Sequence, residues 1–174
     1  MTTFPLTTTL NRIWAIEPCD AGKARALQAA GKTGPDDALI SYVQIVEAVG
    51  LNDALWCCRA EPQHGRLWRL FAVWCARRVQ PADADPRSIA ALDVAERHAN
   101  GEASDGELAV ARADAARADA WDAAERAAAW AAAWDAAWAA ADAAADAADA
   151  DAQERAAQRA AFLQLVTTGT LPEP

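Results

Sequence analysis

The stretch AAAWAAAWDAAWAAADAAADAADA, residues 127–150, contains only alanine, tryptophan and aspartate. This segment has the most biased composition of a chain of 174 residues in which fifty are alanine. Alanine is the strongest helix former because its side chain loses no rotamer freedom in a helix, and the β-branched residues that favour strands are few and scattered. The sequence therefore predicts one all-α domain over residues 1–174, a multi-helix bundle of about seven to nine helices.

On a single straight helix, residues 127–150 divide into three stripes. One stripe holds three tryptophans, the next holds four aspartates, and the remaining arc is alanine alone. The tryptophans are Trp130, Trp134 and Trp138, and the aspartates are Asp135, Asp142, Asp146 and Asp149. We expect the tryptophans to anchor this segment on a leucine-rich core. The alanine face has no bulk, so it predicts close contact with another helix, either inside the bundle or in a homodimer.

The net charge of −9 is distributed unevenly along the chain. Residues 1–104 hold twelve acidic and eleven basic residues, whereas residues 105–174 hold thirteen acidic residues and five arginines. Binding of that end to bare nucleic acid or to an anionic membrane is therefore disfavoured, and a basic protein is the favoured partner. The aspartate row has two interpretations: a solvated stripe on a core helix, or a row of anions that imitates backbone phosphates and binds arginines of a partner.

The C-terminal segment, residues 104–168, differs in character from the short-helix part at 1–103. It opens with the capping box Ser104-Asp105-Gly106-Glu107, and no glycine or proline follows before Gly169. A single helix over 105–166 would run about 93 Å, several times the radius of gyration of about 16 Å that suits a chain of this length. We therefore expect a break, near 119–122 or near 149–152, where two further Asp-x-x-Glu boxes begin.

Shorter helices are predicted before residue 104. The first two helices are predicted over Thr9–Ile16 and over Asp20–Ala30, the second closed by Gly31. A third is predicted from Asp36-Asp37 to Gly50, and a fourth, capped by Asn52 or Asp53, ends before Pro62. The fifth covers Gly65–Val79, and the sixth runs from Pro86 to Asn100-Gly101. The fifth helix is amphipathic, with Leu67, Leu70, Phe71, Trp74 and Cys75 on its apolar arc. Trp74, and Trp56 on the fourth helix, are predicted structural anchors.

Arg78 is an exception on the fifth helix because its position falls inside the apolar arc. Either the helix has ended before this residue, or the guanidinium must find a buried carboxylate, since an unpaired charge is costly to bury. The sequence alone leaves both alternatives open.

No catalytic motif of a known type is present. Gly31-Lys32-Thr33 resembles the end of a phosphate-binding loop, but Ala26 stands where that motif needs its first glycine, so a helix-terminating glycine explains it better. Cys57, Cys58, His64 and Cys75 could meet at a zinc ion, yet adjacent cysteines rarely ligate one metal and their neighbours are apolar. An unrecognised site around Glu96, Arg97 and His98 is the remaining enzymatic alternative. We expect no enzyme, no cofactor and no metal.

Four cysteines without a CxxC pair, and an N-terminus without the features of a signal peptide, predict reduced thiols in the cytoplasm. No uncharged apolar run reaches the length that spans a membrane, so we expect a soluble protein.

Three segments carry a family resemblance: Gly50-Leu51-Asn52-Asp53-Ala54-Leu55-Trp56-Cys57, then Arg69 to Arg77 (RLFAVWCAR), and the block from Asp85-Pro86-Arg87 to Glu102 that leads into Ala-Ala-Ala-Trp repeats. With these, the chain resembles the alanine-rich immunity proteins of bacteria and their prophages, over roughly residues 11–165. The resemblance implies a helical, non-enzymatic protein that neutralises a toxin. Prophage relatives imply a neighbouring role, in which a phage protein blocks a defence complex such as a CRISPR effector.

Two functions follow as expectations. In the first, the chain is an acidic inhibitor whose row of Asp135, Asp142, Asp146 and Asp149 occupies a basic nucleic-acid-binding surface of a toxin or defence effector. In the second, it is a structural module that forms a homodimer through its alanine face.

Overall fold

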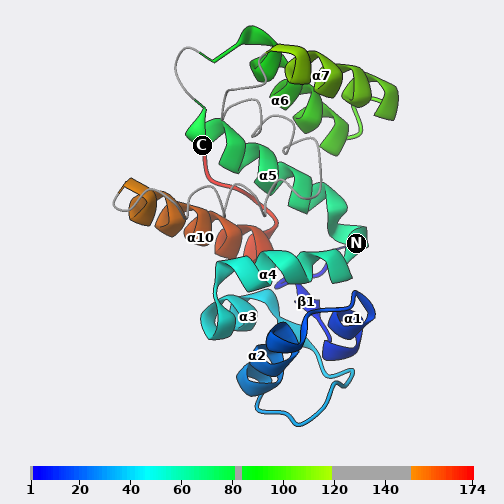
Figure 1. The fold of residues 1–174 in the computed structure, drawn as a ribbon, viewed down its shortest axis with the longest axis vertical. Coiled ribbons are helices and arrows are strands. Elements are labelled where there is room, and N and C mark those ends of the chain that lie inside the picture. The colour runs from blue at the N-terminus through cyan, green and yellow to red at the C-terminus, as the bar shows by residue number, and fades with distance from the viewer. Residues whose placement is uncertain (1, 81–83, 119–149) are drawn as a thin grey trace. The chain divides into compact units, whose positions relative to one another are not determined.

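The structure is a computed structural model that describes residues 2–80, 84–118 and 150–174. Eight α-helices, two short 3-10 helices and two strands of two residues lie in these ranges (Figure 1). In chain order they are β1 (Thr7–Thr8), α1 (Leu10–Ala15), α2 (Asp20–Ala30), β2 (Ile40–Ser41), α3 (Tyr42–Val49), α4 (Leu51–Cys57), η1 (Cys58–Ala60), η2 (Pro62–His64), α5 (Gly65–Val79), α6 (Pro86–Ala99), α7 (Asp105–Ala118) and α10 (Ala150–Thr168). The all-α prediction is confirmed.

The chain divides into two compact units. Unit 1 comprises residues 1–63 and 159–171, and unit 2 comprises residues 64–158 and 172–174. The C-terminal segment therefore contributes to both units. The change of composition at Ser104 falls inside unit 2 and does not mark a boundary between them.

A small antiparallel ladder organises unit 1. Thr7 pairs with Ser41 and Thr8 with Ile40. The backbone N–H of Leu6 donates to the carbonyl of Val166 at 2.7 Å, so this end of the ladder is tied to α10. The buried apolar side chains of the unit are Leu6, Leu10, Ile13, Tyr42, Ile45, Val46, Ala54, Leu55, Cys57, Cys58, Ala161, Phe162, Leu165 and Val166.

The start of the third helix differs from the prediction. Asp36 and Asp37 do not begin a helix, because residues 35–39 form an irregular connection and Ile40 joins the strand β2. Helix α3 begins only after Ser41, whose hydroxyl accepts a hydrogen bond from the N–H of Gln44 while the Gln44 side chain accepts one from the N–H of Ser41. This reciprocal capping box satisfies two backbone donors and fixes the later start.

Two smaller corrections concern α4 and α5. Helix α4 begins at Leu51 after Gly50, and no side chain caps it, so the predicted caps Asn52 and Asp53 lie within the helix. Helix α5 has the predicted bounds but is buried over a wider arc. Trp68 and Val73 are buried in addition to the predicted residues, whereas Leu70 is half-buried.

The predictions for the alanine-rich segment fall outside the described residues. These are the three-stripe helix at 127–150, the anchors Trp130, Trp134 and Trp138, and a break near 119–122; the second break site, near 149–152, is described only from residue 150 onward. Within the described ranges, no helix has both the length and the apolar composition that a membrane span requires.

Candidate functional site

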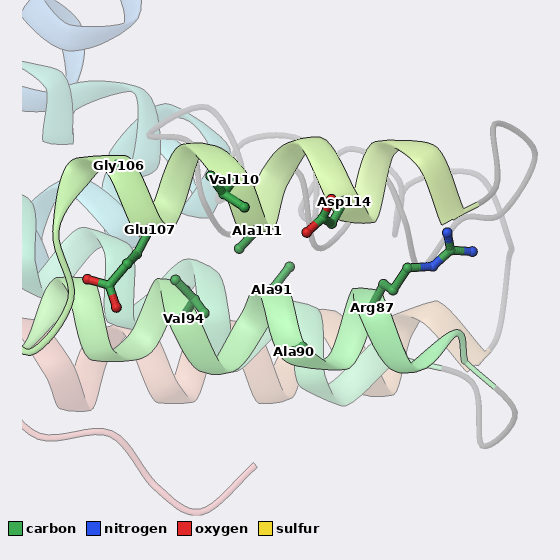
Figure 2. A pocket seen from close by; sticks show the side chains of 9 residues that line it. All are labelled: Arg87, Ala90, Ala91, Val94, Gly106, Glu107, Val110, Ala111 and Asp114. Carbon is green, nitrogen blue, oxygen red and sulfur yellow. The ribbon is translucent and has the colours of Figure 1, made fainter.

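Helices α6 and α7 form a hairpin in unit 2, and local capping defines both of them. The Asp85 carboxylate accepts a hydrogen bond from the N–H of Arg87 at 2.8 Å, at the start of α6. At the start of α7, the Ser104 hydroxyl accepts from the N–H of Glu107 and the Glu107 carboxylate accepts from the N–H of Ser104. Gly101, with φ of 78°, lies in the short connection. Helices joined by so short a connection run antiparallel, as Figure 2 shows.

Small side chains bring the two helices together. Ala91 and Ala95 of α6 and Ala115 of α7 are buried in one apolar cluster with Leu92 and Leu108. Val73 and Ala76 of α5 belong to the same cluster. Because alanine has little bulk, the helix axes can approach closely. Alanine side chains therefore form the contact between α6 and α7, the kind of contact that the sequence predicts for residues 127–150.

A groove of about 430 Å³ runs along the open side of the hairpin. Its lining residues are Arg87, Ala90, Ala91 and Val94 of α6 and Gly106, Glu107, Val110, Ala111 and Asp114 of α7. Figure 2 shows Ala111 and Ala91 facing each other across the two helices. Val110 has 61% of its surface exposed, although it is a large apolar residue. The uncharged part of the lining is therefore apolar, with three alanines, two valines and one glycine.

Charged side chains lie at both ends of this groove. At one end, Arg87 donates to both carboxylate oxygens of Asp85, at 3.1 and 3.0 Å, and the pKa of Asp85 is lowered chiefly by that contact. At the other end, Arg97 lies 3.5 Å from Glu107. The backbone N–H of Ser104 is the main cause of the lowered pKa of Glu107. These arginines are thus engaged by carboxylates of the hairpin itself.

The residues of the enzymatic alternative do not converge on one site. Glu96 accepts a hydrogen bond from Arg77 at 2.6 Å, and Arg97 lies beside Glu107. The Nε2 atom of His98, in the last turn of α6, lies 2.8 Å from the Asp105 carboxylate. Each residue contacts a different partner, and none belongs to the lining of the α6–α7 groove.

Of the two alternatives for Arg78, the structure shows the second, a carboxylate partner. Helix α5 continues to Val79, so the alternative that it ends earlier is wrong. The guanidinium of Arg78 donates to both oxygens of Glu154 and lies 5.0 Å from the ring centroid of Trp74. The indole N–H of Trp74 donates to the carbonyl of Pro172 at 3.0 Å. Trp74 is buried, with 5% of its surface exposed, and Trp56 is half-buried on α4.

Unit 1 contains a buried carboxylate that the sequence analysis missed. Glu61 has 1% of its side chain exposed, and both of its oxygens accept hydrogen bonds from Arg12, at 3.0 and 2.9 Å. Gln63 donates a further hydrogen bond to it. Glu61 follows η1 and precedes Pro62, and no helical periodicity marks such a position in the sequence. The pair stabilises the unit and has no feature of a reactive site.

The cysteines are free thiols, and three of them are buried. Burial raises the pKa of Cys57 to about 12 and raises those of Cys58 and Cys75. Buried thiols of this kind are poor nucleophiles. In the part of the chain that the structure describes, no group of three or more histidine, cysteine or acidic side chains is placed to hold a metal ion. Gly31 caps α2 in the left-handed conformation, with φ of 62°, which fits its predicted role as a helix terminator.

The proposed acidic row, Asp135, Asp142, Asp146 and Asp149, lies outside the described residues. The α6–α7 groove was not predicted, although its signal is present in the sequence. Residues 87, 90, 91 and 94 on α6 and residues 107, 110, 111 and 114 on α7 share the spacing i, i+3, i+4, i+7. That spacing places four residues on one face of a helix. Comparison of the chain with protein-family models, curated proteins and solved structures gives no match.

Proposed function

We propose that this chain is a non-enzymatic acidic inhibitor that binds a partner protein through the partner's basic, nucleic-acid-binding surface. The partner would be a nuclease toxin or a defence effector of the CRISPR type, and the chain would be of the immunity type found in bacteria and prophages. The observation that carries the proposal is the concentration of negative charge in residues 105–174, which have thirteen acidic residues and five arginines.

The chemistry of recognition follows from that charge. A nuclease binds the phosphate backbone through lysine and arginine, and carboxylates at helical spacing can engage the same cations with charge-assisted hydrogen bonds. Asp135, Asp142, Asp146 and Asp149 are the residues proposed to do so. Such contacts weaken as salt screens them.

Ion pairs engage several arginines of the described residues. Arg25 is held by Asp53 at 2.7 Å, Arg77 by Asp93 at 2.9 Å, and Arg78 by Glu154. Cations engaged in this way contribute little attraction to an external phosphate. Each of these pairs also engages one carboxylate, so the net charge of −9 is unchanged by the pairing, and this acidic excess favours a cationic partner.

The test begins with capture of proteins from a bacterial host on the immobilised full chain. Captured proteins are identified by mass spectrometry and purified, and their cleavage or binding of nucleic acid is measured with and without the chain. We expect inhibition of a basic, nucleic-acid-binding protein, with the complex dissolving at about 0.5 M salt.

A matched pair of variants separates the aspartate row from total charge. One variant replaces Asp135, Asp142, Asp146 and Asp149 by asparagine. The other removes four exposed acidic charges from unit 1 by amide substitution at Glu17, Asp20, Asp37 and Glu47. Inhibition should be lost only in the first variant. Unchanged binding by the first variant would refute the phosphate-mimic mechanism, and a captured partner that retains full activity in the complex would refute inhibition.

A further inference from the structure

The connection between α6 and α7 contains the dipeptide Asn100-Gly101. Asn100 is the C-cap of α6, and both residues are exposed. An asparagine followed by glycine is chemically labile, because glycine has no side chain to keep its backbone nitrogen away from the carboxamide. The other two asparagines of the chain, Asn11 and Asn52, lie inside helices and are followed by an arginine and an aspartate. Asn100 is therefore the asparagine whose neighbour leaves its carboxamide most open to attack.

The reaction open to this dipeptide converts the carboxamide into a carboxylate. The backbone N–H of Gly101 loses its proton to a base in the solvent, and the nitrogen attacks Cγ of Asn100. A C–N bond forms, and the carboxamide nitrogen takes up a proton and leaves as ammonia, so that a succinimide ring remains. Water then opens the ring at either carbonyl. Opening at one carbonyl gives aspartate, and opening at the other gives isoaspartate, in which the backbone runs through Cβ of residue 100.

The folded chain keeps the attacking nitrogen away from the carboxamide. Gly101 has φ of 78°, and its N–H donates to the carbonyl of His98 at 3.0 Å. The N–H of Glu102 donates to the carbonyl of Arg97 at 2.8 Å, which completes a Schellman motif at the end of α6. Ring closure requires the Gly101 nitrogen to eclipse Cβ of Asn100, but with ψ of −1° it eclipses the backbone nitrogen of Asn100 instead. The reaction therefore requires the last turn of α6 to open.

Arg66 of α5 holds the carboxamide itself. Its Nη2 atom donates to Oδ1 of Asn100 at 2.8 Å. Because the carboxamide must change its orientation before the Gly101 nitrogen can reach Cγ, this contact adds to the free energy of opening. After the reaction the same guanidinium faces a carboxylate, and charge-assisted hydrogen bonds are stronger than those of a neutral amide. Arg66 therefore opposes the reaction in the folded chain and stabilises its aspartate product.

We propose that Asn100-Gly101 is a site of spontaneous deamidation, which the Schellman motif and Arg66 hold closed and which reacts when the end of α6 opens. The modification adds one negative charge to the α6–α7 connection. In the isoaspartate form it also adds a methylene group to the backbone, so the Schellman motif cannot re-form with its native geometry. The site is independent of the proposed binding of a basic partner, since it needs only water and the chain itself.

The full chain is incubated in mildly alkaline buffer, with and without urea, to test this site. Peptide mapping by mass spectrometry locates each product by the mass gained when OH replaces NH2. Because the reaction proceeds from the open form, its rate follows the population of that form. We expect Asn100 to react at least about tenfold faster in urea than in the folded chain, and Asn11 and Asn52 to react more slowly than Asn100 in urea.

Variants then separate Arg66 from the rest of α5. R66M removes the hydrogen bond to the carboxamide and should speed the reaction of the folded chain about threefold. R69M makes the same change one turn later on α5 and should leave the rate unchanged. In urea the natural chain and both variants should react at one common rate, because the contact is then absent from all three. Circular dichroism checks that the variants fold.

The product is tested with N100D, which supplies the aspartate form alone. This variant should unfold at the same urea concentration as the natural chain or at a higher one, because its carboxylate can pair with Arg66. The deamidated fraction of the natural chain, isolated by anion exchange, should unfold at a lower concentration than N100D, because it also contains isoaspartate.

Three outcomes overturn the proposal. If Asn100 stays unmodified in urea, the dipeptide is not a deamidation site. If it reacts as fast in the folded chain as in urea, the fold does not hold it closed. If R66M reacts no faster than R69M in the folded state, Arg66 does not protect the carboxamide, and a slower reaction of R66M would show that the guanidinium activates the carboxamide instead.

Discussion

The guanidinium of Arg78 donates three hydrogen bonds to the carboxylate of Glu154, which lies 76 residues later in the sequence. Nε donates to both oxygens, at 3.1 and 3.0 Å, and Nη2 donates to Oε2 at 2.9 Å. The side chains are 30% and 17% exposed, so the pair is only partly open to water. The carboxylate raises the pKa of Arg78, and Trp74 covers the guanidinium. The pair joins α5 to the first turns of α10 within unit 2.

Loss of either member of this pair should destabilise the protein. We expect E154Q and R78M each to lower the free energy of unfolding by about 1–2 kcal/mol, because charge-assisted hydrogen bonds are lost and the remaining partner is left half-buried. The double variant should cost less than the sum of the two. Urea denaturation measures all three. R159M, on the exposed side of α10, is the control and should change stability by no more than about 0.5 kcal/mol. Strictly additive effects would contradict the pairing.

The Arg78 pair shows what a sequence can and cannot predict. The position of Arg78 on the helix indicates that it needs a carboxylate, because helical periodicity is a local property. The identity of that carboxylate depends on which surface packs there, and Glu154 comes from a distant segment. The pairing of Arg12 with the buried Glu61 cannot be predicted from the sequence for the same reason. The bounds of α2 and α6, whose starts are capped by the side chains of Cys19 and Asp85, agree with the prediction. The bounds of α5 agree as well, although no side chain caps that helix.

The predicted start of the third helix is too early because a local helix signal competes with a long-range strand pairing. Asp36-Asp37 after Pro35 is a reasonable helix start, but Ile40 pairs with Thr8, a long-range interaction that periodicity does not reveal. The α6–α7 groove was missed for a different reason. Its spacing is visible in each helix, yet a groove exists only once the two stripes lie side by side.

Acid should weaken the start of α7 through Glu107. Its pKa is lowered by the N–H and hydroxyl of Ser104, so the folded state holds the ionised form. A carboxylate with a lowered folded pKa contributes stability above its unfolded value, near 4.5, and that contribution is lost as the pH falls through the folded pKa. We expect the free energy of unfolding to fall between about pH 5 and pH 3, and to fall less in E107Q.

The control for this experiment is E102Q, since Glu102 is exposed in the same connection and its side chain belongs to no capping box. Urea denaturation at each pH gives the free energy of unfolding of the natural chain, E107Q and E102Q, and hence its dependence on pH. Glutamine at position 107 can still accept the hydrogen bond from Ser104, so the difference reports titration rather than loss of the cap. If the free energy of unfolding depends on pH in the same way in E107Q and in the natural chain, Glu107 does not contribute to this pH dependence.

Glu17 adopts an unfavourable backbone conformation that glycine would relieve. It follows α1 with φ of 55°, and its N–H donates to the carbonyl of Trp14. A side chain in this left-handed region costs about 1–2 kcal/mol, part of which the greater freedom of glycine in the unfolded chain offsets. We expect E17G to raise the free energy of unfolding by about 0.5–1 kcal/mol. E47G, on an exposed position inside α3, should lower it by about 0.5–1 kcal/mol. Changes of the same sign in both variants would exclude this explanation.

The cysteines should react in two distinct classes. Cys19 is exposed, and its sulfur accepts a hydrogen bond from the N–H of Gly22, whereas Cys57, Cys58 and Cys75 are buried. Burial raises the pKa of Cys57 to about 12, so almost no thiolate forms at pH 8, and the other two buried thiols are shifted in the same direction. We expect a thiol reagent at pH 8 to modify one cysteine rapidly in the folded chain and four in urea. C19S should abolish the rapid reaction and leave the slow one unchanged. Rapid modification of C19S in the folded state would show that a buried thiol is accessible and would contradict the packing of its unit.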